Sequence, residues 1–184
     1  MSRGFLSICI LVLMLVPASA RAWEWSLGAS MSAATMRSGE NRGTSTSFAL
    51  PSNALTYQPG FRLGYGSKRR THEILLDGGA LVIGEEGSTV SLIVGSLAYQ
   101  HAFGRSLTSN PYANLGLGFL REGSALAAGS NATFGAGVGW RRVLREERGD
   151  LRAEIRYDYL KSGGPFDRPN LTTVGLRLGF DLWL

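Results

Sequence analysis

The sequence predicts an all-β fold: an eight-stranded antiparallel up-and-down transmembrane β-barrel that follows an N-terminal signal peptide. Three observations predict it. Apolar residues alternate with polar or small ones over eight stretches, 25 glycines accompany a hydrophobic content of 44%, and a secretory leader stands at the start. No later stretch approaches the roughly 18 apolar residues of a spanning helix. Apolar content without long runs is typical of strands with one face in lipid.

The leader divides the chain into a signal peptide over residues 1–22 and a barrel over residues 23–184. Phe5–Val16 is an apolar run too short for a spanning helix, and small residues follow it. We expect cleavage after Ala20 or Ala22, because both follow the small-x-small pattern.

The first four alternating stretches are Trp23–Met36, Ala54–Gly66, Thr71–Ile83 and Thr89–His101. The first sets tryptophans and Leu27 against serines, as a strand with two different faces requires. Pro59 weakens the second, because proline cannot donate to a ladder. The third carries Glu73 and Asp77 in its polar register, and the fourth is apolar in both registers, so its faces stay open.

The last four stretches are Pro111–Arg121, Ala132–Leu144, Leu151–Tyr159 and Leu171–Leu184. Glycine fills much of the polar register in the fifth and sixth. The seventh alternates apolar residues with charges. The eighth runs to the carboxyl terminus and sets six apolar residues against Arg177 and Asp181. We expect this last strand to close the barrel.

The connections alternate in length. With both termini in the periplasm, the first, third, fifth and seventh connections face outward. Three of these are long, including the polar loop Arg37–Asn53, and the compact turn Gly84–Gly87 is the exception. Short periplasmic turns and longer outer loops are typical of outer-membrane barrels.

The polar register predicts a charged ladder inside the barrel. An eight-stranded barrel is just wide enough for side chains to fill it, and buried charges are tolerated only when they are paired and hydrogen-bonded. We expect the seventh strand to pair with Arg177 and Asp181 of the eighth. A structural role that fixes register is the main interpretation, and a gated ion or proton path is the alternative. The ladder comprises Arg62, Glu73, Asp77, Arg141, Arg152, Glu154, Arg156, Asp158, Arg177 and Asp181.

Aromatic residues predict the two membrane interfaces, where amphipathic rings gather. Most fall near the periplasmic boundary, and three tyrosines fall near the outer one. The predicted interfacial residues are Trp23, Trp25, Tyr57, Tyr65, Tyr99, Tyr112, Trp140, Tyr157, Tyr159 and Phe180.

The sequence lacks the common motifs of enzymes and nucleotide-binding proteins. It contains no HExxH, P-loop, Rossmann or Gly-x-Ser-x-Gly motif. His72 and His101 have no cysteine partner, since Cys9 lies in the leader. We therefore assign no catalytic, cofactor-binding or metal residue and expect no cofactor. The net charge of +5 comes without a basic stripe interleaved with aromatics, so nucleic acid is not an expected partner.

Three segments carry a resemblance to a known family. PYANLGLGF, FGAGVGWRRVL and LRAEIRYDYL resemble strands of the OmpA-type and opacity-protein family of small outer-membrane β-barrels. The resemblance implies a non-enzymatic structural or surface role in the bacterial outer membrane. It implies contact with outer-membrane lipid and lipopolysaccharide, a host or matrix ligand at the outer loops, and recognition of residues 171–184 by the barrel-assembly machinery. These barrels usually end in Phe or Trp, whereas Leu184 follows Trp183 here.

A second resemblance bears on enzymatic activity. IRYDYLKSGGPFDRPN is similar in shape to the end of the lipid A deacylase (PagL-like) barrel, whose penultimate strand carries a His-x-Ser pair. Those positions hold Arg156 and Asp158 here, so a general base and a hydroxyl nucleophile are missing. An outer-membrane hydrolase acting on lipid A or phospholipid, and a narrow channel, are the alternative functions.

Overall fold

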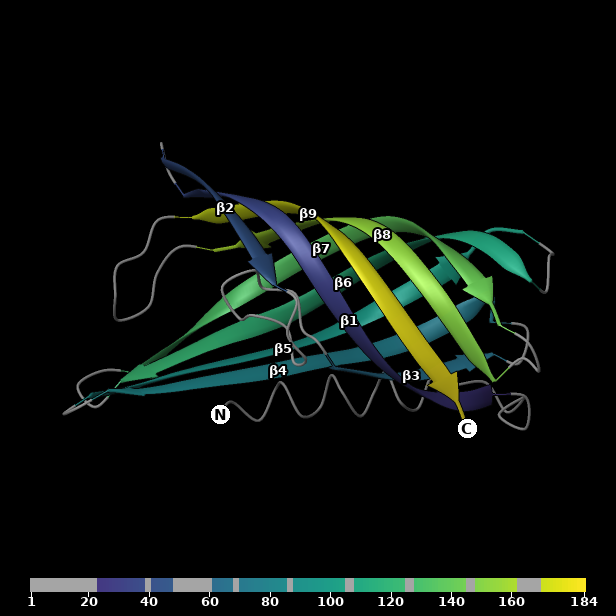
Figure 1. Cartoon of the computed structure of the whole chain (residues 1–184), viewed down its shortest axis with the longest axis horizontal. Helices are drawn as coiled ribbons and strands as arrows, with labels where there is room; N and C mark the ends of the chain where they lie inside the picture. Colours follow the sequence, from purple (N-terminus) through teal and green to yellow (C-terminus); the bar gives the residue numbers. More distant parts are fainter. Residues whose placement is uncertain are drawn as a thin grey trace.

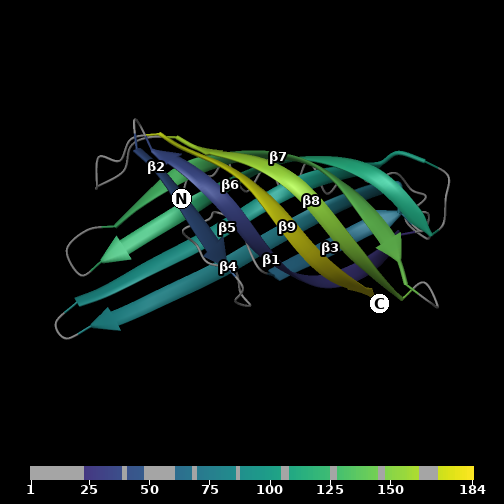
Figure 2. The same cartoon turned by 45° about the horizontal axis from the view of Figure 1, so that its top comes forward.

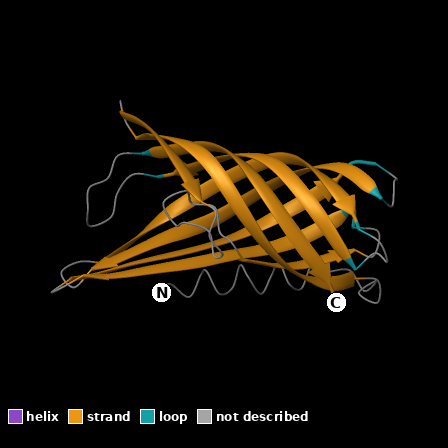
Figure 3. Ribbon diagram, in the orientation of Figure 1, coloured by secondary structure: helices purple, strands orange, loops and turns teal. Residues whose placement is uncertain are grey.

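The chain forms a wall of antiparallel strands that closes on itself (Figure 1). The computed structural model describes residues 23–38, 41–47, 61–67, 70–85, 88–104, 108–124, 128–144, 148–161 and 170–184. Its described connections lie at the two ends of the wall (Figure 3). The strands are β1 (Trp23–Ser38), β2 (Asn41–Ser47), β3 (Phe61–Ser67), β4 (His72–Glu85), β5 (Ser88–Ala102), β6 (Ser109–Ser124), β7 (Ala128–Val143), β8 (Gly149–Leu160) and β9 (Leu171–Trp183).

The barrel closes where β1 meets β9. Residues 26–38 of β1 pair with the whole of β9, and the two strands run side by side in Figure 2. The backbone N–H of Leu184 also donates to the carbonyl oxygen of Trp25 (2.9 Å). The end that carries the start of β1 and the end of β9 is called the terminal rim below. The expectation that the last strand closes a barrel is confirmed.

The expected loop Arg37–Asn53 is wrong over part of its length. β1 continues to Ser38, and β2 pairs antiparallel with residues 32–38 of β1. On the same edge of β1, β3 pairs only as far as Ala29. Without β2 the rest of that edge would leave backbone groups unpaired, which is costly in lipid. Because β2 and β3 share one position in the wall, nine strands form the predicted eight-stranded barrel.

The wall is apolar outside and polar inside. On β8, Leu151, Ile155 and Tyr157 are 48%, 59% and 48% exposed. The residues of the alternate register, Arg152, Glu154 and Arg156, are buried. β9 alternates in the same way. A soluble barrel has its apolar face inward, so this arrangement excludes a lipocalin-type fold. An apolar outer face is the arrangement of a barrel surrounded by lipid.

The faces of β5, which the pattern leaves open, are determined by pairing with its neighbours. Ile93 and Tyr99 point outward with 42% and 49% exposure, whereas Val94 points inward with 5%. Val94 joins Leu120 and Leu160 in a small apolar cluster. β6 and β8 carry these two leucines toward their ends remote from the terminal rim, so apolar side chains fill part of that half of the lumen.

Some expectations fall outside the described residues. These are the signal peptide over residues 1–22, the start of the second predicted strand with Pro59, and the interfacial residue Tyr57. Within the ranges given above, no helix is long and apolar enough to cross a membrane.

Candidate functional site: the charged lumen

All ten residues of the predicted ladder point into the lumen. Each is buried, with an exposed fraction of at most 6%. They come from β3, β4, β7, β8 and β9, so the network spans the interior instead of lining one side. Burial of this many charges requires internal partners. Each of the ten side chains makes at least one of the contacts below, although single atoms such as Nε and Nη2 of Arg177 have no hydrogen-bond partner among the described residues.

Asp77 is the first hub of the network. It lies directly opposite Arg62 on the neighbouring strand. Arg62 donates from Nε to Oδ1 (2.5 Å) and from Nη2 to Oδ2 (3.0 Å) of Asp77. Arg177 of β9 reaches the same carboxylate across the lumen, with Nη1 3.4 Å from Oδ2. These charge-assisted, partly bidentate bonds tie β3, β4 and β9 together.

Glu154 is the second hub. From β6, the Tyr112 hydroxyl (3.1 Å) and the Asn114 amide (2.6 Å) both donate to its Oε2. Arg156 donates from Nε to Asp158 Oδ1 (2.7 Å) and from Nη1 to Asn114 Oδ1 (3.0 Å). β6 and β8 are not neighbours in the wall, so these bonds link them through the lumen.

Glu73 is the third hub and lies toward the terminal rim. Arg141 of β7 donates to its Oε1 across the lumen, and the Gln100 amide donates to Oε2 (3.0 Å). The Nη2 of Arg141 also donates to the backbone carbonyl of Arg70 (2.5 Å). Arg141 is 1% exposed, so its guanidinium depends on these protein partners.

The β3–β4 turn folds Arg70 back into the mouth of the lumen. Arg70 has a φ of 55°, a left-handed conformation that is uncommon for a residue other than glycine. Its guanidinium lies 4.4 Å from the centre of the Trp183 ring, within the range of a cation–π contact. Burial lowers the pKa of Arg70, and the Asp150 carboxylate acts in the opposite direction.

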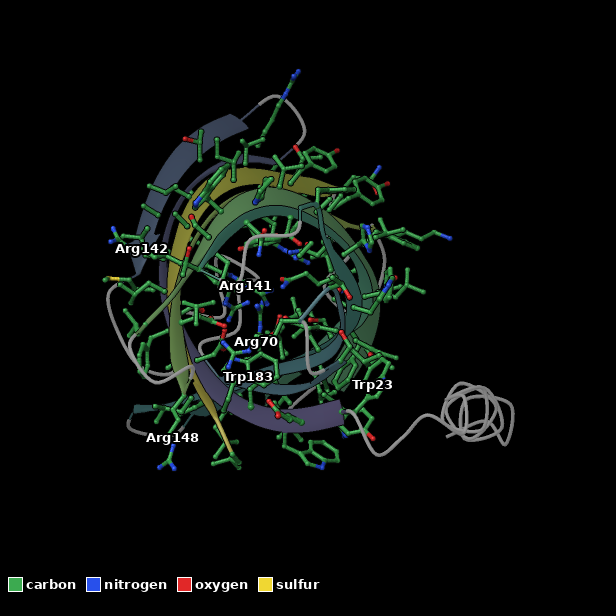
Figure 4. The ribbon with its side chains drawn as sticks, turned by 90° about the vertical axis from the view of Figure 1, so that its right-hand side faces the viewer. Trp23, Arg70, Arg141, Arg142, Arg148 and Trp183 are labelled. Carbon is green, nitrogen blue, oxygen red and sulfur yellow. The ribbon has the colours of Figure 1, made fainter. Side chains whose placement is uncertain are left out.

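Asp150 and Trp183 complete the closure of this mouth. The indole N–H of Trp183 donates to Asp150 Oδ2 (2.9 Å), and Arg70 Nη1 lies 3.7 Å from the same oxygen. Looking into this end, Figure 4 shows Arg70, Arg141 and Trp183 inside the ring of strands. The mouth at the terminal rim is therefore occupied by interlocked side chains.

The ion pairs along β8 differ in part from the expected ones. Arg152 does bond β9, donating from Nη2 to Asp181 Oδ1 (2.7 Å). Arg156 instead bonds Asp158, two residues along its own strand, and Arg177 crosses to β4. The reason is the register, because β9 places Gly175 opposite Arg156 and so offers it no acceptor.

Glycine in the polar register makes room for these long side chains. A Cβ at Gly135 would collide with the side chains of Arg156 and Asp158. A Cβ at Gly28 would collide with the carboxylate of Asp181. The abundance of glycine thus follows from the size of the charged side chains that share a narrow lumen.

The interfacial aromatics lie on the outer face, with one exception among the described residues. At the terminal rim Tyr65 contacts both Trp23 and Trp25, with ring centres 5.1 and 4.7 Å apart. Tyr112 is the exception and its assignment is wrong. It is 2% exposed and bonds Glu154 inside the lumen. Tyr112 is in the same register of β6 as Asn114, so its side chain points into the lumen even though it lies near the end of the strand. The others, all at least partly exposed, are Tyr99, Trp140, Tyr157, Tyr159 and Phe180.

Five lumen residues of these contacts are not among the predicted site residues. Asn114 lies in the polar register of its strand, so alternation indicates its direction. Trp183 follows Asp181 in the inward register of β9, so the alternation alone indicates its direction. Gln100 lies in a strand whose faces the pattern leaves open. Asp150 precedes the predicted start of its strand. Arg70 gives no signal at all, because its inward direction depends on the turn conformation.

The described side chains of the lumen form ion pairs and hydrogen bonds with one another. Arg156 and Asp158, at the positions of the deacylase His-x-Ser pair, are buried and bonded to each other. In the described part of the chain, no group of three or more His, Cys, Asp or Glu residues is placed to hold a metal ion. The contacts of the described lumen residues are those of a buried salt-bridge network.

Comparison with known proteins gives structural likeness without close sequence relatives. No family model matches the chain, and no curated protein matches it. The crystal structure of Neisserial surface protein A has a TM-score of 0.62 at 15% identity and covers 86% of this chain and 96% of that one. The structure of outer membrane protein AlkL in lipid bilayers has a TM-score of 0.50 at 16% identity, covering 89% and 90%. Ail, the attachment invasion locus protein of Yersinia pestis, has a TM-score of 0.48 at 15% identity, covering 89% and 99%.

The likenesses to Neisserial surface protein A and AlkL establish the fold. The chain has the architecture of the small outer-membrane β-barrels, and the fold expected from the OmpA-type and opacity-protein resemblance is confirmed. At such low identity they carry no ligand or activity over to this chain.

Removal of Arg141 tests the network. We expect Arg141→Met to lower the free energy of unfolding by about 3–5 kcal/mol, because it leaves the buried Glu73 carboxylate without its cation. Urea unfolding of the barrel in lipid vesicles, followed by tryptophan fluorescence, measures this loss.

Arg142→Met is the matched control, since Arg142 points outward from the next position of β7 (Figure 4). We expect it to change the free energy of unfolding by less than about 1 kcal/mol. The network account fails if the two variants are equally stable.

Proposed function

We propose that the chain is a non-enzymatic bacterial outer-membrane protein that anchors surface-exposed hairpins and loops in the envelope. The observation that carries this proposal is the length of β4 to β7. These strands have 14, 15, 16 and 16 residues, whereas about 9–11 tilted residues span the bilayer. The excess projects as the β4–β5 and β6–β7 hairpins at the end remote from the terminal rim (Figure 1).

The short turn at the terminal rim gives the proposed orientation of the barrel in the membrane. Small outer-membrane barrels have short periplasmic turns and longer outer loops. The terminal rim carries the turn after Ser67, where Arg70 N–H donates back to the Ser67 carbonyl (2.5 Å). In the proposed orientation this rim faces the periplasm and the projecting hairpins face the cell surface.

The filled lumen favours an anchor over a channel. Charged side chains bond across it at the level of Asp77, Glu154 and Glu73, and Trp183 and Arg70 occupy the terminal mouth. Such a network fixes strand register and resists shear of the wall. A narrow channel and a lipid hydrolase are the alternative functions.

The proposed partners follow from the two surfaces. The apolar outer wall contacts outer-membrane lipid and lipopolysaccharide. The alternating face of residues 171–184 is the segment that the barrel-assembly machinery would read. The projecting hairpins and the outer loops would carry a contact with a host or matrix ligand.

An epitope tag tests the orientation and the surface role. We expect a tag inserted after Glu86, between β4 and β5, to bind antibody on intact cells, because that hairpin projects outward. A tag inserted after Glu146, between β7 and β8, should bind antibody only after the outer membrane is permeabilised. Flow cytometry measures both, and the reverse pattern would overturn the proposed orientation.

Planar-bilayer recording separates an anchor from a channel. We expect the purified barrel to show no steady open-channel current, because the buried ion pairs close the lumen. Detergent alone and a porin in the same bilayers serve as negative and positive controls. A steady current that Arg156→Ala alters would assign the network to ion conduction instead.

A further inference from the structure

The two histidines of the chain meet on the outer face of the barrel at the terminal rim. His72 at the start of β4 lies directly opposite His101 near the end of β5. Their chain neighbours Glu73 and Gln100 are buried in the lumen, so the imidazoles point away from it. They belong to no part of the charged network described above.

Backbone pairing brings these two side chains close together. The neighbouring pair, Thr71 and Ala102, carries a backbone hydrogen bond (N–H of Ala102 to the carbonyl of Thr71, 2.9 Å). In an antiparallel ladder, hydrogen-bonded pairs alternate with non-hydrogen-bonded ones. His72 and His101 therefore form a non-hydrogen-bonded pair, the kind in which side chains approach most closely. Their ring centres are 4.8 Å apart at an interplanar angle of 47°.

The two Nδ1 atoms are 3.4 Å apart. Two imidazole nitrogens that each lie about 2.0–2.1 Å from a tetrahedral zinc ion are separated by roughly 3.3–3.4 Å. The observed spacing therefore matches that of two ligands on one ion. The Tyr99 hydroxyl is hydrogen-bonded to His72 Nδ1 (2.6 Å), which keeps an oxygen atom next to the pair; an ion at Nδ1 would replace this hydrogen bond.

We propose that His72 and His101, with Tyr99 beside them, bind one divalent transition-metal ion at the terminal rim. Imidazole nitrogen suits zinc and copper(II), and copper(II) binds such ligands most tightly among the first-row divalent ions. Two histidines leave coordination positions for water. The site therefore belongs to the exchangeable class, not to the closed four-ligand structural sites. A bound ion cross-links β4 to β5 where their ladder ends.

The competing interpretation is an aromatic contact at the membrane interface. His101 meets Phe103 edge-on with ring centres 4.8 Å apart, and the His72 and Tyr99 rings lie 6.1 Å apart. Hydrogen bonds of His72 Nδ1 with the Tyr99 hydroxyl (2.6 Å) and with His101 Nδ1 (3.4 Å) would bring these atoms together in such packing without a metal ion. The distinguishing observable is direct coordination of a metal ion by nitrogen.

Metal titration of the intact barrel tests the proposal. The full chain, expressed without a polyhistidine tag and extracted from membranes, is titrated with Zn²⁺ by calorimetry and with Cu²⁺ by electron paramagnetic resonance. We expect about one ion per chain, with nitrogen hyperfine structure from two imidazoles in the copper spectrum.

Three variants assign the ligands. We expect His72→Gln and His101→Gln each to weaken binding by at least about tenfold, because each leaves a single imidazole. The double variant should abolish binding. Tyr99→Phe should weaken binding less, and Tyr157→Phe, an outward tyrosine on β8, should leave it unchanged.

Fold is checked separately by the gel mobility shift of the unheated barrel, which these outward substitutions should preserve. The proposal is overturned if the wild-type chain binds no stoichiometric ion. It is also overturned if the folded double variant binds Cu²⁺ as tightly as the wild-type chain does, or if the copper spectrum shows no nitrogen coordination.

Discussion

The structure depends on one constraint: a wall that faces lipid has nowhere but its own interior to place polar groups. Backbone groups must pair strand to strand around a closed ring, because the bilayer core offers no water to replace a missing partner. Pairing of β1 with β9 closes the ring. β2 pairs with the part of the other edge of β1 that β3 does not reach. Charged side chains must likewise find their partners inside the ring.

That second demand shapes the lumen. Three carboxylates, Asp77, Glu154 and Glu73, act as hubs, and each accepts bonds from strands that are not its neighbours in the wall. The bonds therefore act as struts across the barrel and add to the ladder that runs around it. Glycine at Gly135 and Gly28 opens the space that the struts need. Apolar residues such as Val94 fill the remainder toward the other end.

Much of this architecture follows from period-two alternation, since a lipid-facing strand must separate its two faces residue by residue. The closing strand and the inward direction of residues such as Arg62 and Arg177 could be read in this way. The partners of the charged side chains could not be predicted from this pattern. Which acceptors Arg156 and Arg177 bond depends on distances across the lumen, and the strand pattern gives no information on these distances. Arg70 points inward because its own backbone adopts a left-handed conformation. β2 pairs with the part of the β1 edge that β3 does not reach. The spacing of His72 and His101 depends on which ladder pairs are hydrogen-bonded, which a one-dimensional pattern does not specify.

Membrane fractionation combined with gel mobility tests the central claim most directly, because every other inference requires a folded barrel in lipid. Cells that express the full chain are separated into periplasmic, inner-membrane and outer-membrane fractions, and each fraction is run on a gel with and without boiling. The account predicts that the chain sediments with the outer membrane and migrates faster unboiled than boiled, as a closed barrel held by cross-lumen ion pairs should. Recovery in the soluble periplasmic fraction, with identical mobility before and after boiling, would contradict it.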